Sequence, residues 1–422
     1  MRSSRTKTLT WVAGAMAASL VLLSAGPAQA ADPWWFEKMR IGDAHAITKG
    51  GGARVLVYDA EIDPTVPDLE GASLEWSTQC EAGEDSAAES YDPTSAATSP
   101  DASRGTAMTA LVAGQGNGGI VGVAPSAAVL FVAGAPGPEE SDHCERPLAD
   151  LAAQFQAHIV SHSGNYPTDD AQVERLLSDN RVLVAAAGDL EPQLDEPASR
   201  LGVVAVGAAD QEGYNWTGNA GLRADEEGST EVPEPNGAYI TVLAPGVDVP
   251  AGASDDRKWV SGKEVTGTAP ATSIVAGALA LVKAEYPSAT GNQLIQHLIH
   301  ETGGDEFVFQ PTSGFGIVSV TKMLAKDPTG WPDINPLIDT PEDIMAVYPP
   351  EIYGKYAGAT EVPRPEGTAS TDDAEKSAAD ENDSVAQWPL VVGVGVLVLA
   401  LMGGLVFWLT RRRRASDDSV QE

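Results

Sequence analysis

Basic residues are scarce in this chain. Only 26 Lys and Arg stand against 60 Asp and Glu, which gives a formal net charge of -34. A charge of that sign and size repels the phosphates of nucleic acids and the headgroups of anionic lipids, so we exclude nucleic acid as a partner. The hydrophobic content of 43% in 422 residues is ordinary for a globular chain with a sizeable core.

Charge is absent from two apolar runs, one near each end of the chain. Residues 1–30 combine a positive start, an apolar run from Trp11 to Leu23 and a small-residue cleavage site at its end, which is typical of a signal peptide; an uncleaved anchor is the less favoured alternative. The 23 uncharged residues 388–410 are long enough to cross a bilayer core of roughly 30 Å, and four arginines follow at once. We therefore predict a single-pass protein of the cell membrane, with its N-terminal domain outside the cytoplasm and a cytoplasmic tail at 411–422.

Cysteine is nearly absent, since the chain has only Cys80 and Cys144. Two cysteines in an exported protein favour a disulfide, worth about 4 kcal/mol for a loop of that length in the chain-entropy model; two free thiols are the alternative. A metal site at His143 is less favoured because no other ligand is spaced nearby, and the other histidines show no metal-ligand spacing with acids. We expect no metal and no cofactor.

Short β-branched runs alternate with longer helical patterns from Arg54 onward, which indicates parallel strands joined by crossover helices. Their apolar content suits a sheet covered on both faces. Residues 269–285 predict a buried helix because they are apolar nearly all round, and residues 290–301 predict an amphipathic helix. The sequence thus predicts an α/β fold, and the expected strands are Arg54–Tyr58, Ala128–Val132, His158–Ser161, Val182–Ala186, Val203–Val206 and Ile240–Val242.

Loops and a linker lie around these elements. The acidic stretches 75–103 and 134–147 are rich in Ser, Pro and Gly, hold one cysteine each and predict surface loops. Residues 357–387 have no aromatic residue and cannot bury enough apolar surface to fold. We therefore expect the folded domain at 31–330 and a Pro- and acid-rich linker at 331–387.

Six short motifs occur in a fixed order along the chain. Asp59 ends V-L-V-Y-D, Arg104 opens R-G-T-A-M-T-A, and Asp189 ends V-A-A-A-G-D. G-V-A-P at 122–125, L-A-P-G at 243–246 and T-G-T-A-P at 266–270 complete the order. This order resembles that of the subtilisin-like serine proteases over about residues 34–320. The resemblance implies their three-layer fold, with a mostly parallel central sheet and helices on both faces.

The two ends of the chain indicate a particular subgroup of this family. An aromatic start, W-W-F-E-K-M-R-I-G-D-A-H, leads into a glycine-rich segment before Asp59, and the chain closes with the linker, one apolar segment and a basic tail. This arrangement is similar to that of the mycosins, the membrane-anchored subtilases of actinobacterial type VII secretion systems. The resemblance implies subunits of such a membrane complex as partners.

The residues that would carry the chemistry depart from the family pattern. Acyl transfer needs a serine oxygen as nucleophile, a histidine as base and an aspartate that orients the histidine. By the resemblance only Asp59 is kept, because Arg104 stands at the histidine position and Ala269 at the serine position. A guanidinium does not lose a proton in proteins and a methyl group has no nucleophilic atom. These substitutions predict a proteolytically inactive member of the family.

Three further residues bear on this prediction. Asp189 stands at the position of the oxyanion-hole asparagine, where a developing negative charge needs a hydrogen-bond donor. Ser273 as a substitute nucleophile and His162 as a substitute base are both disfavoured, because Ser273 lies a helical turn too far along and a base without a nucleophile has no role. If the fold is kept, Arg104 and Asp59 are in contact, so we predict an ion pair between them.

Three interpretations of the function remain open. The sequence favours a noncatalytic scaffold in a type VII secretion membrane complex. The second is a peptide-binding module in which an extended peptide adds as a β-strand in the old cleft. The third is a protease of unfamiliar chemistry, against which the missing serine speaks.

Overall fold

The computed structural model describes the following residues: 33–79, 92–134, 146–164, 166, 168–190, 193–220, 223–224, 230–231, 239–304 and 307–338. All of them belong to one unit of the chain. The expected signal peptide, Cys80, Cys144, the segment 388–410 and nearly all of the linker lie outside these ranges, so what the sequence predicts for them stays a prediction. Within the described ranges, none of the helices combines the length and the apolar character that a bilayer crossing needs.

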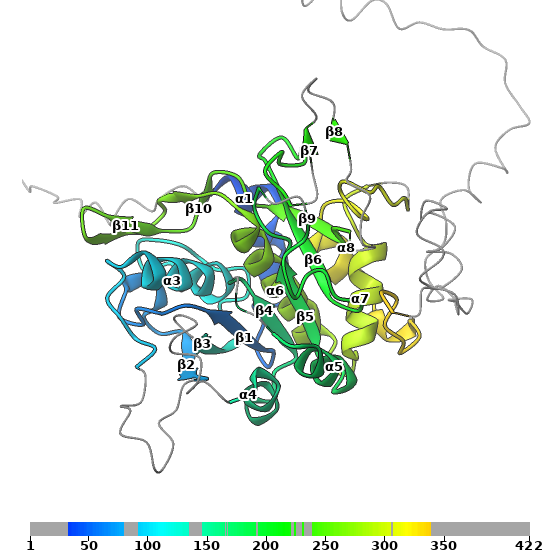
Figure 1. Ribbon diagram of the computed structural model, residues 1–422, viewed down its shortest axis with the longest axis horizontal. Coiled ribbons are helices and arrows are strands. Elements are labelled where there is room, and N and C mark those ends of the chain that lie inside the picture. The colour runs from blue at the N-terminus through cyan, green and yellow to red at the C-terminus, as the bar shows by residue number, and fades with distance from the viewer. Residues whose placement is uncertain are drawn as a thin grey trace, which may run out of the picture. The chain divides into compact units, whose positions relative to one another are not determined.

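A seven-stranded sheet forms the middle layer of this unit (Figure 1). The spatial order is β2-β3-β1-β4-β5-β6-β9, and every neighbouring pair is parallel. Because the chain leaves β1 toward one side of the sheet and later fills the other side from β4 onward, the carboxyl ends of β1 and β4 form the topological switch point, where open α/β sheets hold their sites. The strands are β1 (Arg54–Asp59), β2 (Ser73–Thr78), β3 (Ala128–Ala133), β4 (Ile159–His162), β5 (Val182–Ala186), β6 (Val204–Ala209) and β9 (Val242–Pro245).

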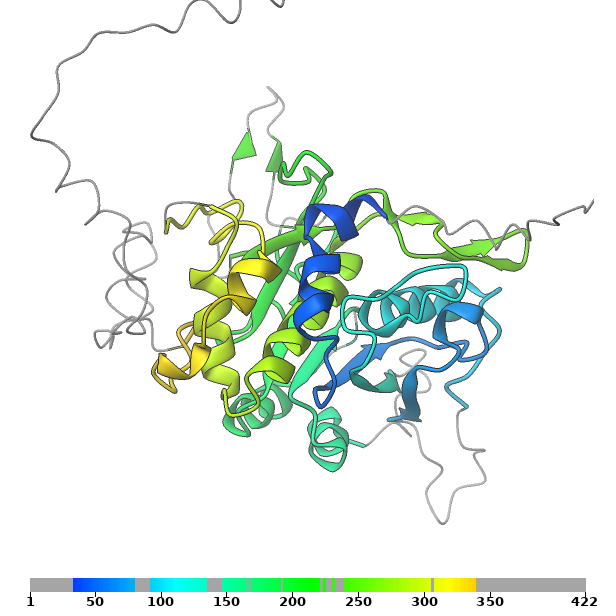
Figure 2. The ribbon, with the colours of Figure 1, turned by 180° about the vertical axis from the view of Figure 1, so that it is seen from behind.

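Helices cover both faces of the sheet, as Figures 1 and 2 show from opposite sides. Val55 and Val57 pack into the core under one set of helices, whereas Leu56 and Tyr58 pack into the core under the other, because successive strand residues point to opposite faces. The first set is α3 (Pro100–Ala113), α6 (Thr268–Glu285), α7 (Gly291–His300) and α8 (Val320–Leu324), and the second is α4 (Leu148–Phe155) and α5 (Asp170–Ser178).

Short elements complete the described chain. They are the helices α1 (Trp34–Lys38) and α2 (Ile41–Ile47), the 3-10 turns η1 (Pro67–Leu69) and η3 (Pro328–Gly330), and the short strands β7 (Arg223–Ala224), β8 (Thr230–Glu231), β10 (Val249–Pro250), β11 (Ala253–Asp255), β12 (Lys258–Val260) and β13 (Glu264–Val265). β10 pairs with β13 and β11 with β12, each antiparallel. These four strands form a ribbon that leads into α6.

Helix α6 sets the position of the site. Every residue from Pro270 to Val282 is buried, and the helix contacts five strands of the sheet, which confirms the predicted buried helix. The predicted amphipathic helix is confirmed as α7, which begins with a capping box in which Thr290 and Gln293 bond each other's backbone N–H.

Each predicted strand overlaps an observed one, and the last begins two residues later than expected, at Val242. The predicted loop 75–103 is wrong at both ends, because Thr78 still belongs to β2 and α3 already begins at Pro100. β2 lies at the sheet edge with mostly exposed or half-buried side chains, so it lacks a buried-strand pattern. Ser99 caps α3 by accepting a bond from the Ala102 N–H, with proline at the first helical position, where its missing N–H costs nothing. The predicted loop 134–147 lies almost wholly outside the described residues.

Candidate active-site cleft

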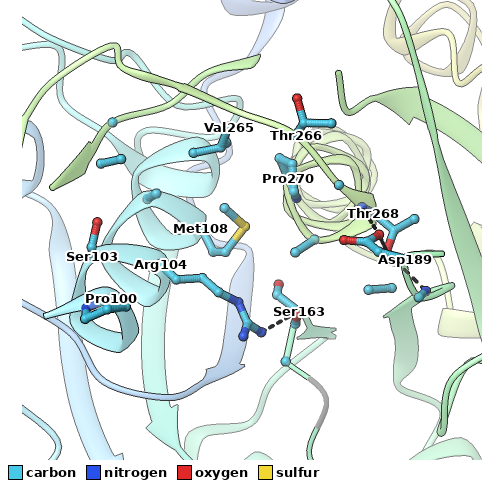
Figure 3. Close-up of a pocket in the computed structure, with 18 of the residues that line it drawn as sticks. Pro100, Ser103, Arg104, Met108, Ser163, Asp189, Val265, Thr266, Thr268 and Pro270 are labelled. Atoms are coloured by element: carbon cyan, nitrogen blue, oxygen red, sulfur yellow. Dashed lines mark hydrogen bonds between the residues drawn. The ribbon is translucent and has the colours of Figure 1, made fainter. Parts of the chain in front are cut away.

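A cleft of about 610 Å³ opens at the carboxyl ends of the strands, between α3 and the start of α6 (Figure 3). Arg104 and Met108 of α3 line one side, and the segment Val265–Pro270 lines the side where the ribbon becomes α6. Ser163, which follows β4, and Asp189, which follows β5, lie between them. The cleft therefore lies at the switch point of the sheet and gathers three of the four site residues that the sequence predicts, while the fourth, Asp59, lies behind Arg104.

Arg104 and Asp59 form the predicted ion pair. The Arg104 Nη2 lies 3.3 Å from Asp59 Oδ1, and the same nitrogen donates a hydrogen bond of 2.8 Å to the Ser163 carbonyl oxygen. The Asp59 side chain is 0% exposed and that of Arg104 is 39% exposed. Asp59 thus lies at the end of β1 behind the guanidinium, and Arg104 separates it from the cleft.

The environment of Asp59 depends on that guanidinium. Its Oδ1 also accepts a bond of 2.7 Å from the Ala60 N–H, whereas its buried Oδ2 has no hydrogen-bond partner among the described residues. Burial raises the pKa of Asp59, and the charge of Arg104 and the Ala60 N–H oppose the rise. Since few other groups compensate this carboxylate, removal of Arg104 would leave a buried charge poorly paired.

Ala269 lies in the first turn of α6, at the edge of the cleft. Its side chain is a methyl group in a half-buried position, so the cleft has no hydroxyl there. Pro270 follows within the first turn, where an N–H has no helical partner, so the proline removes nothing that the helix needs. This turn starts α6, and Ala269 gives it no nucleophilic side chain.

Asp189 binds the start of the same helix. Its Oδ1 accepts bonds of 2.9 Å from both the backbone N–H and the hydroxyl of Thr268. A carboxylate at a helix N-terminus is favourable because it pairs with the unsatisfied N–H groups and the positive end of the dipole. Gly267 must be glycine here, because its φ is +148° and a Cβ would lie 2.6 Å from Asp189 Oδ2. Asp189 therefore places in the cleft a hydrogen-bond acceptor that is tied to the start of α6.

His162 and Ser273 do not supply a substitute for the missing groups. His162 is 1% exposed, its Nε2 lies 3.1 Å from Thr168 Oγ1, and burial lowers its pKa to about 4. Ser273 is 0% exposed and its hydroxyl lies 3.3 Å from both Ser163 Oγ and the Ala269 carbonyl oxygen. Both side chains belong to the core beside the cleft rather than to its lining.

The sequence interpretation misses two partners of the site. Ser163 holds Arg104 through a carbonyl oxygen, and Thr268 holds Asp189 through an N–H and a hydroxyl. A carbonyl contact leaves no residue-type signal, and the bond between Asp189 and Thr268 joins positions 79 apart in the chain. Among the described residues, no three His, Cys, Asp or Glu side chains gather in a way that could hold a metal ion.

Comparison with known sequences points to one family. The profile of the Subtilase family, Peptidase_S8, matches residues 50–318. The chain is 32% identical over 282 residues to a thermostable alkaline protease of Halalkalibacterium halodurans, which covers 63% of this chain and 66% of that protease. It is 29% identical over 279 residues to subtilisin Savinase of Lederbergia lenta. That alignment covers 63% of this chain and 89% of subtilisin Savinase. The match thus spans just under two thirds of the alkaline protease and most of subtilisin Savinase.

Solved structures share the fold. The MycP3 protease from the type VII (ESX-3) secretion system aligns with a TM-score of 0.53 at 20% identity over 73% of this chain and 91% of that one. MycP1 from the ESX-1 type VII secretion system aligns with a TM-score of 0.54 at 18% identity over 73% of this chain and 89% of that one. At these identities the likeness concerns the fold alone, a subtilisin-like α/β arrangement around a mostly parallel sheet.

Proposed function

The chain belongs to the subtilase family, and from that premise we propose that it is a proteolytically inactive member that acts as a noncatalytic partner in a type VII secretion complex. The observation that carries the proposal is the contact of 3.3 Å between Arg104 and Asp59. The aspartate that would orient a catalytic histidine is paired instead with a permanent cation, and Ala269 offers no oxygen on the facing helix.

The chemistry of acyl transfer supports inactivity. The first step transfers a serine proton to a base while the oxygen attacks the scissile carbonyl. Arg104 cannot accept that proton, and Ala269 has none to give. In subtilisin, loss of the serine or the histidine alone lowers turnover by about 10⁶, a value that belongs to that enzyme. Asp189 adds a carboxylate where the oxyanion would need a donor, and loss of one such donor lowers the rate by about 10²–10³.

The placement in the cell is proposed from the sequence. It consists of a cleaved signal peptide at 1–30, an outer domain at 31–330, a linker at 331–387, a membrane helix at 388–410 and a cytoplasmic tail at 411–422. The fold neighbours MycP1 and MycP3 are named as components of type VII secretion systems. Together these features support a partner among the membrane subunits of such a system, reached by the outer domain.

Purification from the native membrane tests this role. The tagged full-length protein is solubilised in mild detergent, and the proteins that accompany it are identified. The matched control replaces residues 388–410 with an unrelated membrane helix. We expect secretion-complex subunits with both proteins, because docking occurs through the outer domain. Recovery of the protein alone would refute the proposal, and loss of the subunits in the control alone would refute docking through the outer domain.

Peptide binding is a second candidate, and the volume of the cleft favours it. About 610 Å³ remains open beside Arg104, Met108 and Val265, enough for several side chains of an extended peptide. Under this candidate, extended decapeptides raise the melting temperature of the full-length protein, because a ligand that binds only the folded state stabilises it. They leave the melting temperature of an Ala253→Trp variant unchanged, since Ala253 lines the cleft and the larger side chain fills it.

A further inference from the structure

The wall of the cleft that leads into α6 belongs to a ribbon outside the seven-stranded sheet. We call residues 246–267 the wall ribbon; it contains β10 to β13 and contributes Gly252, Ala253, Val265, Thr266 and Gly267 to the cleft. Two bonds close its base: Asp248 N–H donates to Thr266 Oγ1 at 2.9 Å, and Gly267 N–H donates to the Gly246 carbonyl oxygen at 2.8 Å. The shape of the cleft therefore depends on what holds this base in place.

The far end of the wall ribbon is fastened to the body of the domain. The Trp259 indole N–H donates to Asp68 Oδ2 at 2.7 Å, and the Ser261 hydroxyl donates to Oδ1 of the same buried carboxylate. The Ser254 N–H donates to Ser103 Oγ at 2.7 Å, directly beside Arg104 in the chain. These contacts secure the part of the ribbon that lies against α3, and at the base the N–H groups of Gly246 and Val247 donate to the Ala209 carbonyl oxygen of β6.

The first helix of the domain also holds the base. Figure 2 shows α1, in blue, beside the point where the ribbon leaves the sheet. The Trp34 indole N–H donates to the Asp248 carbonyl oxygen at 2.8 Å, and the Trp35 indole N–H donates to the Pro250 carbonyl oxygen at 3.0 Å. Trp35 is 0% exposed, so its ring is fixed by the core while its N–H reaches the ribbon.

Asp248, which Trp34 contacts, has a left-handed backbone. Its φ is +49°, a conformation that is uncommon outside glycine and that aspartate tolerates better than most residues. Trp34 binds its carbonyl oxygen, and the Thr266 hydroxyl accepts from its N–H and donates to its carboxylate at 3.1 Å. A path of three contacts thus leads from Trp34 through Asp248 to Thr266, which lines the cleft.

We propose that Trp34 and Trp35 are positioning residues of the cleft, which fix the base of the wall ribbon through their indole N–H groups. The position of α1 and the shape of the cleft are then coupled. Because such coupling is reciprocal, a protein that binds α1 changes the position of the wall ribbon, and a ligand in the cleft changes the position of α1.

Hydrogen exchange on the full-length protein in detergent tests the proposal. Trp34→Phe and Trp35→Phe keep an aromatic ring, remove the N–H donor and make the side chain smaller. The reporters are the amides of Ala251, Gly252 and Gly267, which are bonded within the ribbon, and the reference amides are those of α6 from 274 to 282. Each lost bond should speed exchange of the reporters about fivefold and leave the reference amides unchanged.

The control is Trp76→Phe. Trp76 lies on β2 and is 47% exposed, and this change should leave the reporters as they are in the wild type. If the Trp34→Phe and Trp35→Phe variants leave the reporters unchanged, or speed the reporters and the reference amides by one common factor, the tryptophans do not position the wall and the proposal is wrong.

A double-mutant comparison tests the path through Thr266. Thr266→Val removes the hydroxyl that joins Asp248 to the cleft lining. If Trp34 acts along this path, its substitution by Phe should speed exchange at Gly267 less in the Thr266→Val background than in the wild type. Equal effects in both backgrounds would overturn the path, whatever the two changes do to overall stability.

Discussion

Arg104→Ala tests the altered site most sharply, because it removes one partner of the ion pair and leaves the other buried. Asp59 is 0% exposed, and the only other bond to its carboxylate that the structure gives comes from the Ala60 N–H. Breaking a fully buried pair costs about 3–5 kcal/mol, but Arg104 is 39% exposed and water screens part of its charge. We therefore expect the free energy of unfolding to fall by about 2–3 kcal/mol at neutral pH.

The decrease in the free energy of unfolding that Arg104→Ala causes should depend on pH. Burial raises the pKa of Asp59 above its usual value of 3.8, and Arg104 opposes that rise, so the substitution raises the folded-state pKa further. A carboxyl group with a raised folded-state pKa contributes stability below its unfolded pKa, and that contribution is lost as pH rises through the folded value. The wild type and the variant should thus differ little near about pH 4 and most at neutral pH.

Urea unfolding of the full-length protein in detergent, followed by circular dichroism across this pH range, measures the effect. The matched control is Arg175→Ala, which breaks an exposed ion pair of 2.6 Å with Asp150 and should cost less than about 1 kcal/mol. Adding Asp59→Asn to Arg104→Ala should recover part of the loss, because the buried charge is gone. The reasoning is refuted if Arg104→Ala costs no more than the control and the loss is the same at all pH values.

Three further predictions concern the same region. Restoring both Ala269→Ser and Arg104→His should give about 10²–10³ less turnover of a fluorogenic peptide than the same pair with Asp189→Asn, because the oxyanion needs a donor; equal turnover would contradict this. Gly267→Ala should lower the free energy of unfolding by more than about 2 kcal/mol, measured in urea, because φ is +148° and the new Cβ would lie 2.6 Å from Asp189 Oδ2; a neutral effect would contradict the contact. Burial lowers the pKa of His162 from 6.5 to about 4, so the stability that this residue contributes is present above pH 6.5 and lost as pH falls through that window. His162→Asn should therefore flatten the pH dependence of unfolding by up to about one proton, and an unchanged slope would count against the burial argument.

The order of motifs predicts the fold because the framework depends on local patterns. The apolar strands that end at Asp59 and at His162, and the all-round apolar helix that includes Ala269, suit a parallel sheet covered on both faces. The sequence does not predict the edge strand β2, because its side chains are largely exposed or half-buried and show no apolar pattern. Core strands are thus predictable where the exposed edge is not.

The contacts of the candidate site are likewise predictable from the sequence only in part. The pairing of Arg104 with Asp59 is predictable, because a family pattern places the two positions in contact and opposite charges attract. The attachment of Asp189 to Thr268 and of Trp34 to Asp248 is not predictable, because each joins distant parts of the chain and each includes a backbone N–H or carbonyl group. Backbone groups are the same at every residue, so a sequence holds no signal for them.

The central claim is that this subtilase does not cut peptides. The most direct measurement is the turnover of a fluorogenic peptide library by the full-length protein, beside Asp59→Asn as the matched control, since Asp59 is the one triad residue that we expect the chain to keep. The account predicts the same background rate for both proteins. Turnover by the wild type that Asp59→Asn abolishes would contradict it, because hydrolysis would then depend on the site that holds Asp59, Arg104 and Ala269.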